Sequence, residues 1–161
     1  MTRTEITAAP GVPFIDIVRE FDAPPALVYR AYTEPDLLVQ WLGPRRLEME
    51  VEAYDIRDGG RYRYIHREQD GTEYGFHGVF HGEPTLEGIT KTFEFEGWPG
   101  HVSLETVRFE EVEGRTRVHN HSVYQTIEDR DAMAASGMET GITEGYERLD
   151  ELLARLAAPV H

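Results

Sequence analysis

The sequence predicts an α+β fold in which a curved antiparallel sheet wraps around a long C-terminal helix, with two short helices after the first strand. From Leu47 to Thr126 apolar and polar residues alternate, and short turn sequences interrupt the pattern. Strands that follow one another through short turns form an antiparallel meander. After Met138 the apolar residues instead recur every three or four positions, which is typical of an amphipathic helix. Ahead of the meander, one strand precedes two helical stretches.

The N-terminal elements follow from composition and from the placement of proline. Phe14–Phe21 is rich in β-branched and aromatic residues and predicts a strand. The Pro-Pro pair that follows suits the first turn of a helix over Ala26–Tyr32, because the N–H that proline lacks is not needed there. A second helical piece over Glu34–Leu42 is stopped by a Gly-Pro pair.

Residues 1–13 contain one arginine and no apolar run, which predicts a flexible arm rather than a signal peptide. We find no linker or repeat in 14–158 and therefore expect a single domain there. Glycine- and proline-containing turns delimit the remaining strand candidates, which are Leu47–Ile56, Arg61–Gln69, Glu73–Gly82, Ile89–Glu96, His101–Val112 and Arg115–Thr126. The register between the Arg61 and Glu73 strands is left open by the sequence.

The C-terminal helix is expected to run for about five turns, with its apolar stripe against the sheet. Gly141 and Gly145 lie near this stripe, although each glycine costs roughly 1 kcal/mol inside a helix. Close approach by another element, a bend, or simple tolerance would each explain them. The segment 129–137 before the helix is a candidate lid with Gly137 as its hinge, or Gly137 only caps a helix.

Composition excludes several classes of function. The formal net charge is −14, which opposes binding to nucleic acid and to anionic membrane surfaces. No stretch is apolar for long enough to span a membrane. Cysteine is absent, which excludes disulfides, thiolate metal sites and cysteine nucleophiles, and suits a cytoplasmic protein. A homodimer is compatible with the sequence, which does not specify one.

Several stretches together resemble a known family. They are Asp22–Pro25 with Val28 and Tyr29, Thr33–Pro35 leading to Gln40–Pro44, Asp55–Tyr62, and Ala135–Glu139 leading to Gly141 and Gly145. Over about residues 14–157 the chain resembles bacterial proteins similar to the activator of heat-shock protein 90 ATPase, members of the START-like superfamily. The resemblance implies a helix-grip fold that encloses a pocket. It does not imply one function, because the superfamily includes lipid carriers, hormone receptors, polyketide cyclases and antibiotic-sequestering proteins.

An unusual set of polar residues is expected inside this pocket. Family-like strands are apolar at the positions of Val118 and Asn120, so the resemblance places Asn120, Ser122 and Tyr124 inward. A two-residue hairpin loop at Glu113-Gly114 would then set Glu105 opposite Ser122. His66 shares a face with Tyr62 and Tyr64. Buried polar groups need partners, so these side chains orient a ligand, form an internal network, or face solvent if the parity is wrong.

Aromatic and thioether side chains are expected to line the remaining wall. Trp41 and Trp98 stand beside Gly-Pro and Pro-Gly turns, and by analogy with the family such ends frame the pocket mouth. The full set of candidate ligand-binding residues is Trp41, Tyr62, Tyr64, His66, Phe76, Phe80, Phe93, Trp98, Glu105, Asn120, Ser122, Tyr124, Met133, Met138, Ile142 and Tyr146.

No metal site or cofactor is expected. His119 and His121 are two apart on a strand and share a face, as a pair of zinc ligands can. That face is predicted to be outside, however, and the sequence offers no obvious third ligand. His77 and His81 lie in a predicted strand, where a spacing of four does not bring them together as it would on a helix.

Three functions compete. The first, which we favour, is a carrier or sequestering protein that binds an apolar or amphipathic small molecule. The second is a cyclase- or hydratase-type enzyme in which Glu105 and His66 form an acid–base pair. The third is a chaperone-partner module, which would need an exposed apolar patch. The chain contains no motif for a nucleophile elbow or a phosphate loop.

Overall fold

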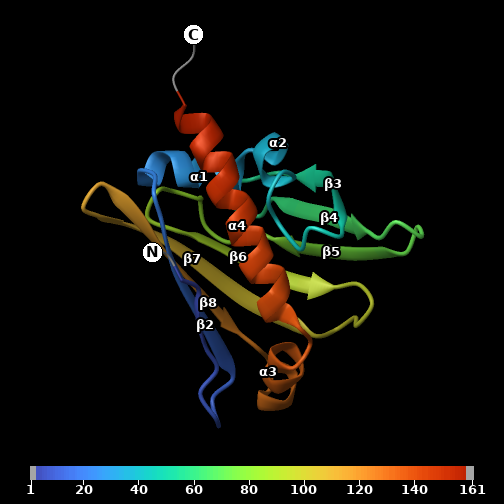
Figure 1. Cartoon of the computed structure of the whole chain (residues 1–161). Coiled ribbons are helices and arrows are strands. Elements are labelled where there is room, and N and C mark those ends of the chain that lie inside the picture. Colours follow the sequence, from blue (N-terminus) through green and yellow to red (C-terminus); the bar gives the residue numbers. More distant parts are fainter. Residues whose placement is uncertain (1–2, 159–161) are drawn as a thin grey trace.

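The computed structural model describes residues 3–158 and confirms the predicted helix-grip architecture. One eight-stranded antiparallel sheet, in the order β1-β2-β8-β7-β6-β5-β4-β3, curves around the long helix α4. Figure 1 shows α4 crossing one face of the sheet, with α1 and α2 at one end and α3 at the other. The elements are β1 (Glu5–Thr7), β2 (Phe14–Phe21), α1 (Pro25–Thr33), α2 (Pro35–Leu38), β3 (Glu48–Tyr54), β4 (Arg61–Arg67), β5 (Glu73–Val79), β6 (Ile89–Phe95), β7 (Val102–Val112), β8 (Arg115–Val123), α3 (Ile127–Ala134) and α4 (Met138–Ala157).

The N-terminal arm and the segment before α4 differ from expectation. Glu5–Thr7 of the arm forms β1 and pairs with β2, whereas residues 1 and 2 lie outside the described part. The candidate lid is largely the helix α3, in which Thr126 caps the first turn by accepting from the N–H of Asp129. The local sequence had no apolar period to predict that helix. Gly137 has a φ of 87° and is the N-cap residue of α4.

The β7–β8 register is as the turn chemistry predicts. Glu113 and Gly114 both have positive φ, which is the geometry of a type I′ turn, and Val112 pairs directly with Arg115. Val107 therefore lies opposite Asn120, and Glu105 opposite Ser122. The register that the sequence left open, between β4 and β5, pairs the following residues: Tyr62 with Gly78, Tyr64 with Phe76, and His66 with Tyr74.

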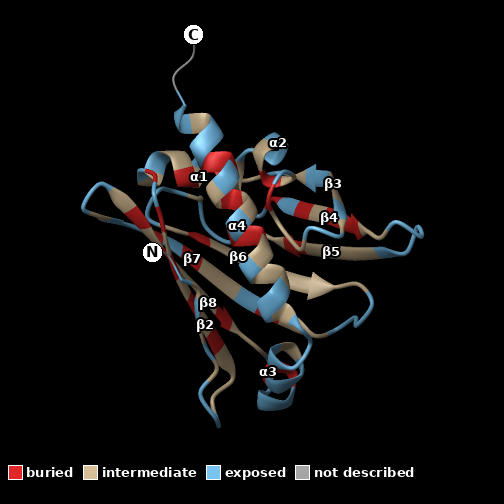
Figure 2. Ribbon diagram, in the orientation of Figure 1, coloured by how far each residue is buried: buried red, intermediate tan, exposed pale blue. Residues whose placement is uncertain are grey.

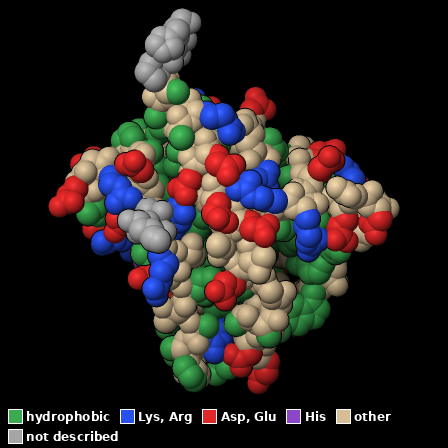
Figure 3. Space-filling view, viewed as in Figure 1, with side chains coloured by type: hydrophobic (Ala, Val, Ile, Leu, Met, Phe, Trp, Pro, Cys, Tyr) green, Lys and Arg blue, Asp and Glu red, His purple; other side chains and the backbone are tan. Residues whose placement is uncertain are grey.

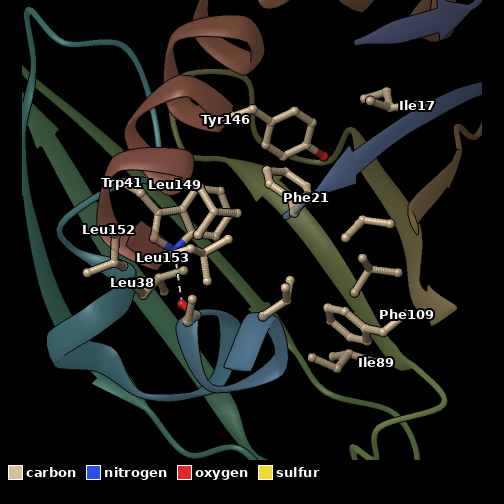
Figure 4. Close-up of a cluster of buried hydrophobic side chains, with 14 of the residues drawn as sticks. Ile17, Phe21, Leu38, Trp41, Ile89, Phe109, Tyr146, Leu149, Leu152 and Leu153 are labelled. Atoms are coloured by element: carbon tan, nitrogen blue, oxygen red, sulfur yellow. Dashed lines mark hydrogen bonds between the residues drawn. The ribbon is translucent and has the colours of Figure 1, made fainter. Parts of the chain in front are cut away.

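The apolar core fills the end of the fold next to α1. Buried residues on α4 lie in its middle and toward its C-terminus, at Gly145, Tyr146, Leu149, Leu152 and Leu153 (Figure 2). Phe21, Leu149 and Trp41 converge there from the sheet, from α4 and from the segment after α2 (Figure 4). None of the helices described is long and apolar enough to cross a lipid bilayer.

Of the two glycines of α4, one lies in close contact with the loop that follows α2. A Cβ added to Gly145 would lie 3.2 Å from Gly43 N and 3.2 Å from Trp41 O. A Cβ added to Gly141 would meet only Pro44 Cδ, at an ordinary 3.6 Å. Close approach therefore explains Gly145, whereas no steric requirement of this kind explains Gly141.

The two glycines should respond oppositely to alanine. We expect Gly141→Ala to raise the free energy of unfolding by about 1 kcal/mol, because alanine is the better helix former and the space is open. At Gly145 the same gain should be cancelled or exceeded, since overpacking against backbone costs about 1–3 kcal/mol. Urea denaturation of both variants checks this; equal effects would contradict the close approach.

Candidate functional site

The inner face of the sheet divides into a packed half and a more open half. Alternation along the strands places Arg19, Ile89, Lys91, Glu105, Asn120 and Ser122 on the same inner face as the aromatics of β4. Toward α1 the inner residues Phe21, Phe80 and Val118 are completely buried or nearly so. Toward α3, Phe93, Asn120 and Tyr124 remain partly accessible although they face α4. This contrast locates the candidate site under the N-terminal half of α4.

Two of the candidate residues lie in the packed half. Trp41 does not frame a mouth: it is 2% exposed, and its Nε1 donates to the carbonyl of Ala31 at 2.9 Å (Figure 4). Phe80 is also core, packed against Tyr54 and Tyr62. The chain does turn beside Trp41. The indole N–H, however, donates to a carbonyl of α1, and this hydrogen bond holds the ring in the core.

The α4 residues above the open half are smaller or more flexible than those above the core. Met138 and Ile142, in the first turns of α4, are partly accessible and pack against the margin of the core, whereas a leucine cluster covers the packed half. On the opposite side of α4, acidic and arginine side chains cover the surface in the view of Figure 3. Arg45, for example, forms a salt bridge with Glu151 at 2.5 Å. The helix therefore presents its apolar stripe to the inner face along its whole length.

Glu105 occupies the middle of the open half. It lies opposite Ser122 on one side and opposite Lys91 on the other. Burial raises the pKa of the Glu105 carboxyl, and the Lys91 charge and the Ser122 hydroxyl offset only part of that effect. A carboxyl in this environment can take up a proton more readily than one in water, and can then donate a hydrogen bond to a ligand.

Lys91 is the functional candidate that the sequence reasoning missed. It is the only lysine in the chain, and the other 15 of the 16 basic residues are arginine. Its ammonium lies 4.7 Å from the centroid of the Tyr62 ring, and burial lowers its pKa. Among the described residues no carboxylate oxygen lies within 4.0 Å of it. Strand parity with Ile89 and Phe93, together with its being a unique residue type, could have identified it.

The proposed acid–base pair of Glu105 and His66 does not form. The two residues stand on β7 and β4, which β5 and β6 separate in the sheet. His66 is 6% exposed, and within residues 3–158 neither its Nδ1 nor Ser103 Oγ on β7 has a hydrogen-bond partner. Glu105 is influenced by Lys91, and His66 by Arg148 on α4. Carboxyl and imidazole are thus separate polar groups on one face.

The other predicted residues occupy three kinds of environment. Tyr62, Tyr64, His66, Ser122 and Tyr146 are buried; Phe76, Phe93, Glu105, Asn120, Tyr124, Met133, Met138 and Ile142 are partly accessible; and Trp98 is exposed. Trp98 stacks on His101 with 3.7 Å between ring centroids, so it covers a loop histidine outside the core.

Neither of two hollows in the described structure coincides with the candidate site. One of about 620 Å³ is bounded by residues 3–8 together with Ala134, Met138 and Glu139. The other, of about 310 Å³, lies at Arg63, Ile65 and neighbouring residues of β4 to β6. Met138 is the one candidate residue that lines either of them. The larger hollow therefore adjoins the start of α4, at the edge of the open half.

Comparison with known proteins agrees with this geometry. Residues 22–154 match the family model described as activator of Hsp90 ATPase homolog 1-like protein. A crystal structure of a protein from Rhodobacter sphaeroides is 29% identical, with a TM-score of 0.87, 95% of this chain and 99% of that chain being covered. A solution structure from Arthrobacter aurescens is 26% identical, with a TM-score of 0.85, covering 98% and 95%. None of the functionally curated proteins compared with the chain matches it.

Proposed function

The chain belongs to the family of activator of Hsp90 ATPase homolog 1-like proteins, and we propose that it binds an apolar or amphipathic small molecule beneath α4, as a carrier or sequestering protein. The helix-grip fold supplies a concave sheet face and a covering helix. Phe76, Phe93 and Tyr124 give the inner face an aromatic wall that is not fully covered. Apolar walls with a few placed polar groups are the usual character of small-molecule sites.

The observation that carries the proposal is the placement of Lys91. An ammonium on an apolar inner face loses hydration, and retaining it there without a close carboxylate is unfavourable for the empty protein. An anionic group on a ligand would replace that hydration. Burial raises the pKa of Glu105, so taking up a proton beside such an anion costs this carboxyl less than it would in water. We therefore expect the ligand to combine an apolar body with an anionic end.

A matched pair of fluorescent probes tests this. 1-Anilinonaphthalene-8-sulfonate carries a sulfonate, and N-phenyl-1-naphthylamine has the same rings without it. We expect both to bind the native protein, with the sulfonate the tighter. Lys91→Met should lower the affinity for the sulfonate probe by about tenfold, which corresponds to losing one ion pair of about 1.4 kcal/mol. The affinity for the neutral probe should stay nearly unchanged. Fluorescence titration at neutral pH measures both affinities.

Arg108→Met is the control for charge alone. Arg108 lies on β7 and is exposed on the outer face, so the variant removes one positive charge from the opposite side of the same sheet. It should leave both affinities unchanged. Glu105→Gln should tighten sulfonate binding, because it removes the negative form of the neighbouring group. Equal losses in the Lys91 and Arg108 variants, or no saturable binding of either probe, would overturn the proposal.

A further inference from the structure

Three potential metal ligands meet on the outer face of the sheet. This face is opposite the inner face that carries Lys91 and Glu105. Asp16 Oδ1 is 2.8 Å from His119 Nε2 and 2.7 Å from His121 Nδ1. The three donor atoms all lie within 4.8 Å of one another. Their side chains are between 26% and 45% exposed, so solvent reaches the cluster.

The sheet itself builds this cluster. His119 and His121 alternate outward along β8, and β2 pairs antiparallel with β8 so that Asp16 lies directly opposite His121. The sequence separates Asp16 from His121 by 105 positions, and the pairing of the two strands removes that separation. Phe14 packs its ring against His121, with 5.0 Å between centroids, and so restricts the imidazole. Ligands on neighbouring strands are held more firmly than ligands on loops.

We propose that Asp16, His119 and His121 form a binding site for a divalent transition-metal ion of the zinc type. Two imidazole nitrogens and one carboxylate oxygen are a donor set that zinc uses when one coordination position stays open. At metal–ligand distances of about 2.1 Å, tetrahedral donors are about 3.4 Å apart. The present separations of 2.7 and 2.8 Å would therefore widen by roughly 0.6 Å, which rotation of exposed side chains supplies.

The surroundings are compatible with a bound cation. The chain carries a formal net charge of −14, and the Asp16 carboxylate supplies a negative charge within the site. Thr106 lies opposite His121 on β7, and Thr7 lies opposite Asp16 on β1, which places hydroxyl groups on the same face. Two arginines on this face oppose a cation: Arg108 lies opposite His119, and Arg117, two residues before His119 on β8, forms an ion pair with Glu20 at 3.1 Å. Arg108 is the one directly opposite a proposed ligand. It is exposed, and its long side chain can extend into water.

The competing explanation is that the cluster is complete without a metal. One carboxylate oxygen would then accept from both imidazoles and do no more than hold β2 to β8. The two explanations differ in what Zn²⁺ does to the protein, and His77 provides the matched control. Its imidazole also contacts carboxylates on the outer face, Glu96 at 2.9 Å and Glu94 at 3.5 Å, and is 44% exposed. In the part of the chain that the structure describes, these carboxylates have no second imidazole beside them.

Isothermal titration of the tag-free full chain with Zn²⁺ alone tests the proposal, with the Co²⁺ absorption spectrum reporting the coordination geometry. We expect saturable binding of one ion per chain, weakened at least about tenfold by His121→Gln and by Asp16→Asn, and unchanged by His77→Gln. Co²⁺ should give the intense visible bands of a low-coordinate site, and the two site variants should lose them. Circular dichroism establishes that each variant is folded.

Two outcomes would overturn the site. If native protein shows no saturable Zn²⁺ binding, or if the His121 and His77 variants lose affinity equally, the cluster is only a structural hydrogen-bonded group. A lower unfolding midpoint for Asp16→Asn without any effect of metal would lead to the same conclusion. Neither result would bear on the inner face, because the probe experiment uses residues on the opposite side of the sheet.

Discussion

Asp150→Ala should lower the free energy of unfolding by about 3 kcal/mol, although Asp150 itself is 39% exposed. Its carboxylate accepts two hydrogen bonds from Arg19, Nη1 to Oδ1 at 2.7 Å and Nη2 to Oδ2 at 2.6 Å. Arg19 comes from the inner face of β2 and is only 6% exposed. Removing the carboxylate leaves a buried guanidinium without its counter-ion, and that penalty dominates the change.

Arg19 has little else to stabilise its charge. The guanidinium carbon lies 4.7 Å from the Phe21 ring centroid and 5.9 Å from that of Tyr146, which gives weak cation–π attraction. Its Nη1 makes a long hydrogen bond of 3.4 Å to the Glu20 carbonyl, and its Nε has no hydrogen-bond partner among the described residues. Arg19→Met should therefore cost less than Asp150→Ala, because it removes the charge together with its need for a partner and keeps the apolar stem. A larger loss for Asp150→Ala than for Arg19→Met would show that the cost comes from leaving the buried guanidinium unpaired. If the ion pair were simply a favourable contact, the two variants would lose similar stability.

Glu151→Ala is the control, because it breaks a similar ion pair that is exposed to solvent. Glu151 is the next residue on α4 and accepts from Arg45 through both oxygens, at 3.3 and 2.5 Å, but both side chains are about half exposed. An exposed pair is worth at most about 1 kcal/mol. Urea denaturation at neutral pH should show the largest loss in the free energy of unfolding for Asp150→Ala, a smaller loss for Arg19→Met and the smallest for Glu151→Ala. Equal costs for Asp150 and Glu151 would show that the Arg19 pair is not desolvated.

The sequence could predict most of the fold because its strongest signals are local. Alternation and turn chemistry specify the β7–β8 hairpin down to its register, and Gly114 with a positive φ fixes where the chain reverses. From that register the inward position of Glu105 follows directly. β1 was beyond this reasoning, because three residues carry no alternation and pair only where β2 offers a free edge.

Site residues could be predicted only where the alternation within a single strand determines which way the side chain points. Trp41 was misplaced because its partner, the Ala31 carbonyl, belongs to another element. Asp16 was not connected with His119 because β2 meets β8 through a pairing across most of the chain, which no turn specifies. Lys91 was missed for a different reason: parity already placed it inward, and its interest comes from being the only lysine.

Acidification from neutral pH to about pH 5 should cost the native protein about 2 kcal/mol through His66 alone. Burial, together with the nearby positive charge of Arg148, lowers the pKa of the His66 imidazole from its ordinary value of 6.5 to about 4. The unfolded chain thus takes up this proton near pH 6.5, and the folded chain only near pH 4. Stability is complete above pH 6.5, falls as the pH falls, and has lost its His66 contribution below about pH 4.

The comparison that isolates this effect is wild type against His66→Gln, which keeps a polar side chain that never takes up the proton. Urea denaturation between pH 7 and pH 5 should give a stability curve about 2 kcal/mol flatter for the variant. The remaining histidines are present in both proteins and cancel in the difference. Parallel curves for wild type and His66→Gln would mean that His66 is hydrated in the native state.

The position of His66 explains why the proton cannot simply be tolerated there. A Cβ on Gly43 would lie 2.5 Å from the His66 Cε1, so the ring is held directly under the loop that also contacts α4 at Gly145. Arg148 of α4 donates to the Gly43 carbonyl at 3.2 Å, which keeps a second positive charge on the same loop. A protonated imidazole could regain hydration only if this loop moved away from α4. Acid should therefore loosen the contact between the loop and α4 first, and hydrogen exchange at pH 5 should show lower protection in the Trp41–Pro44 loop than at pH 7.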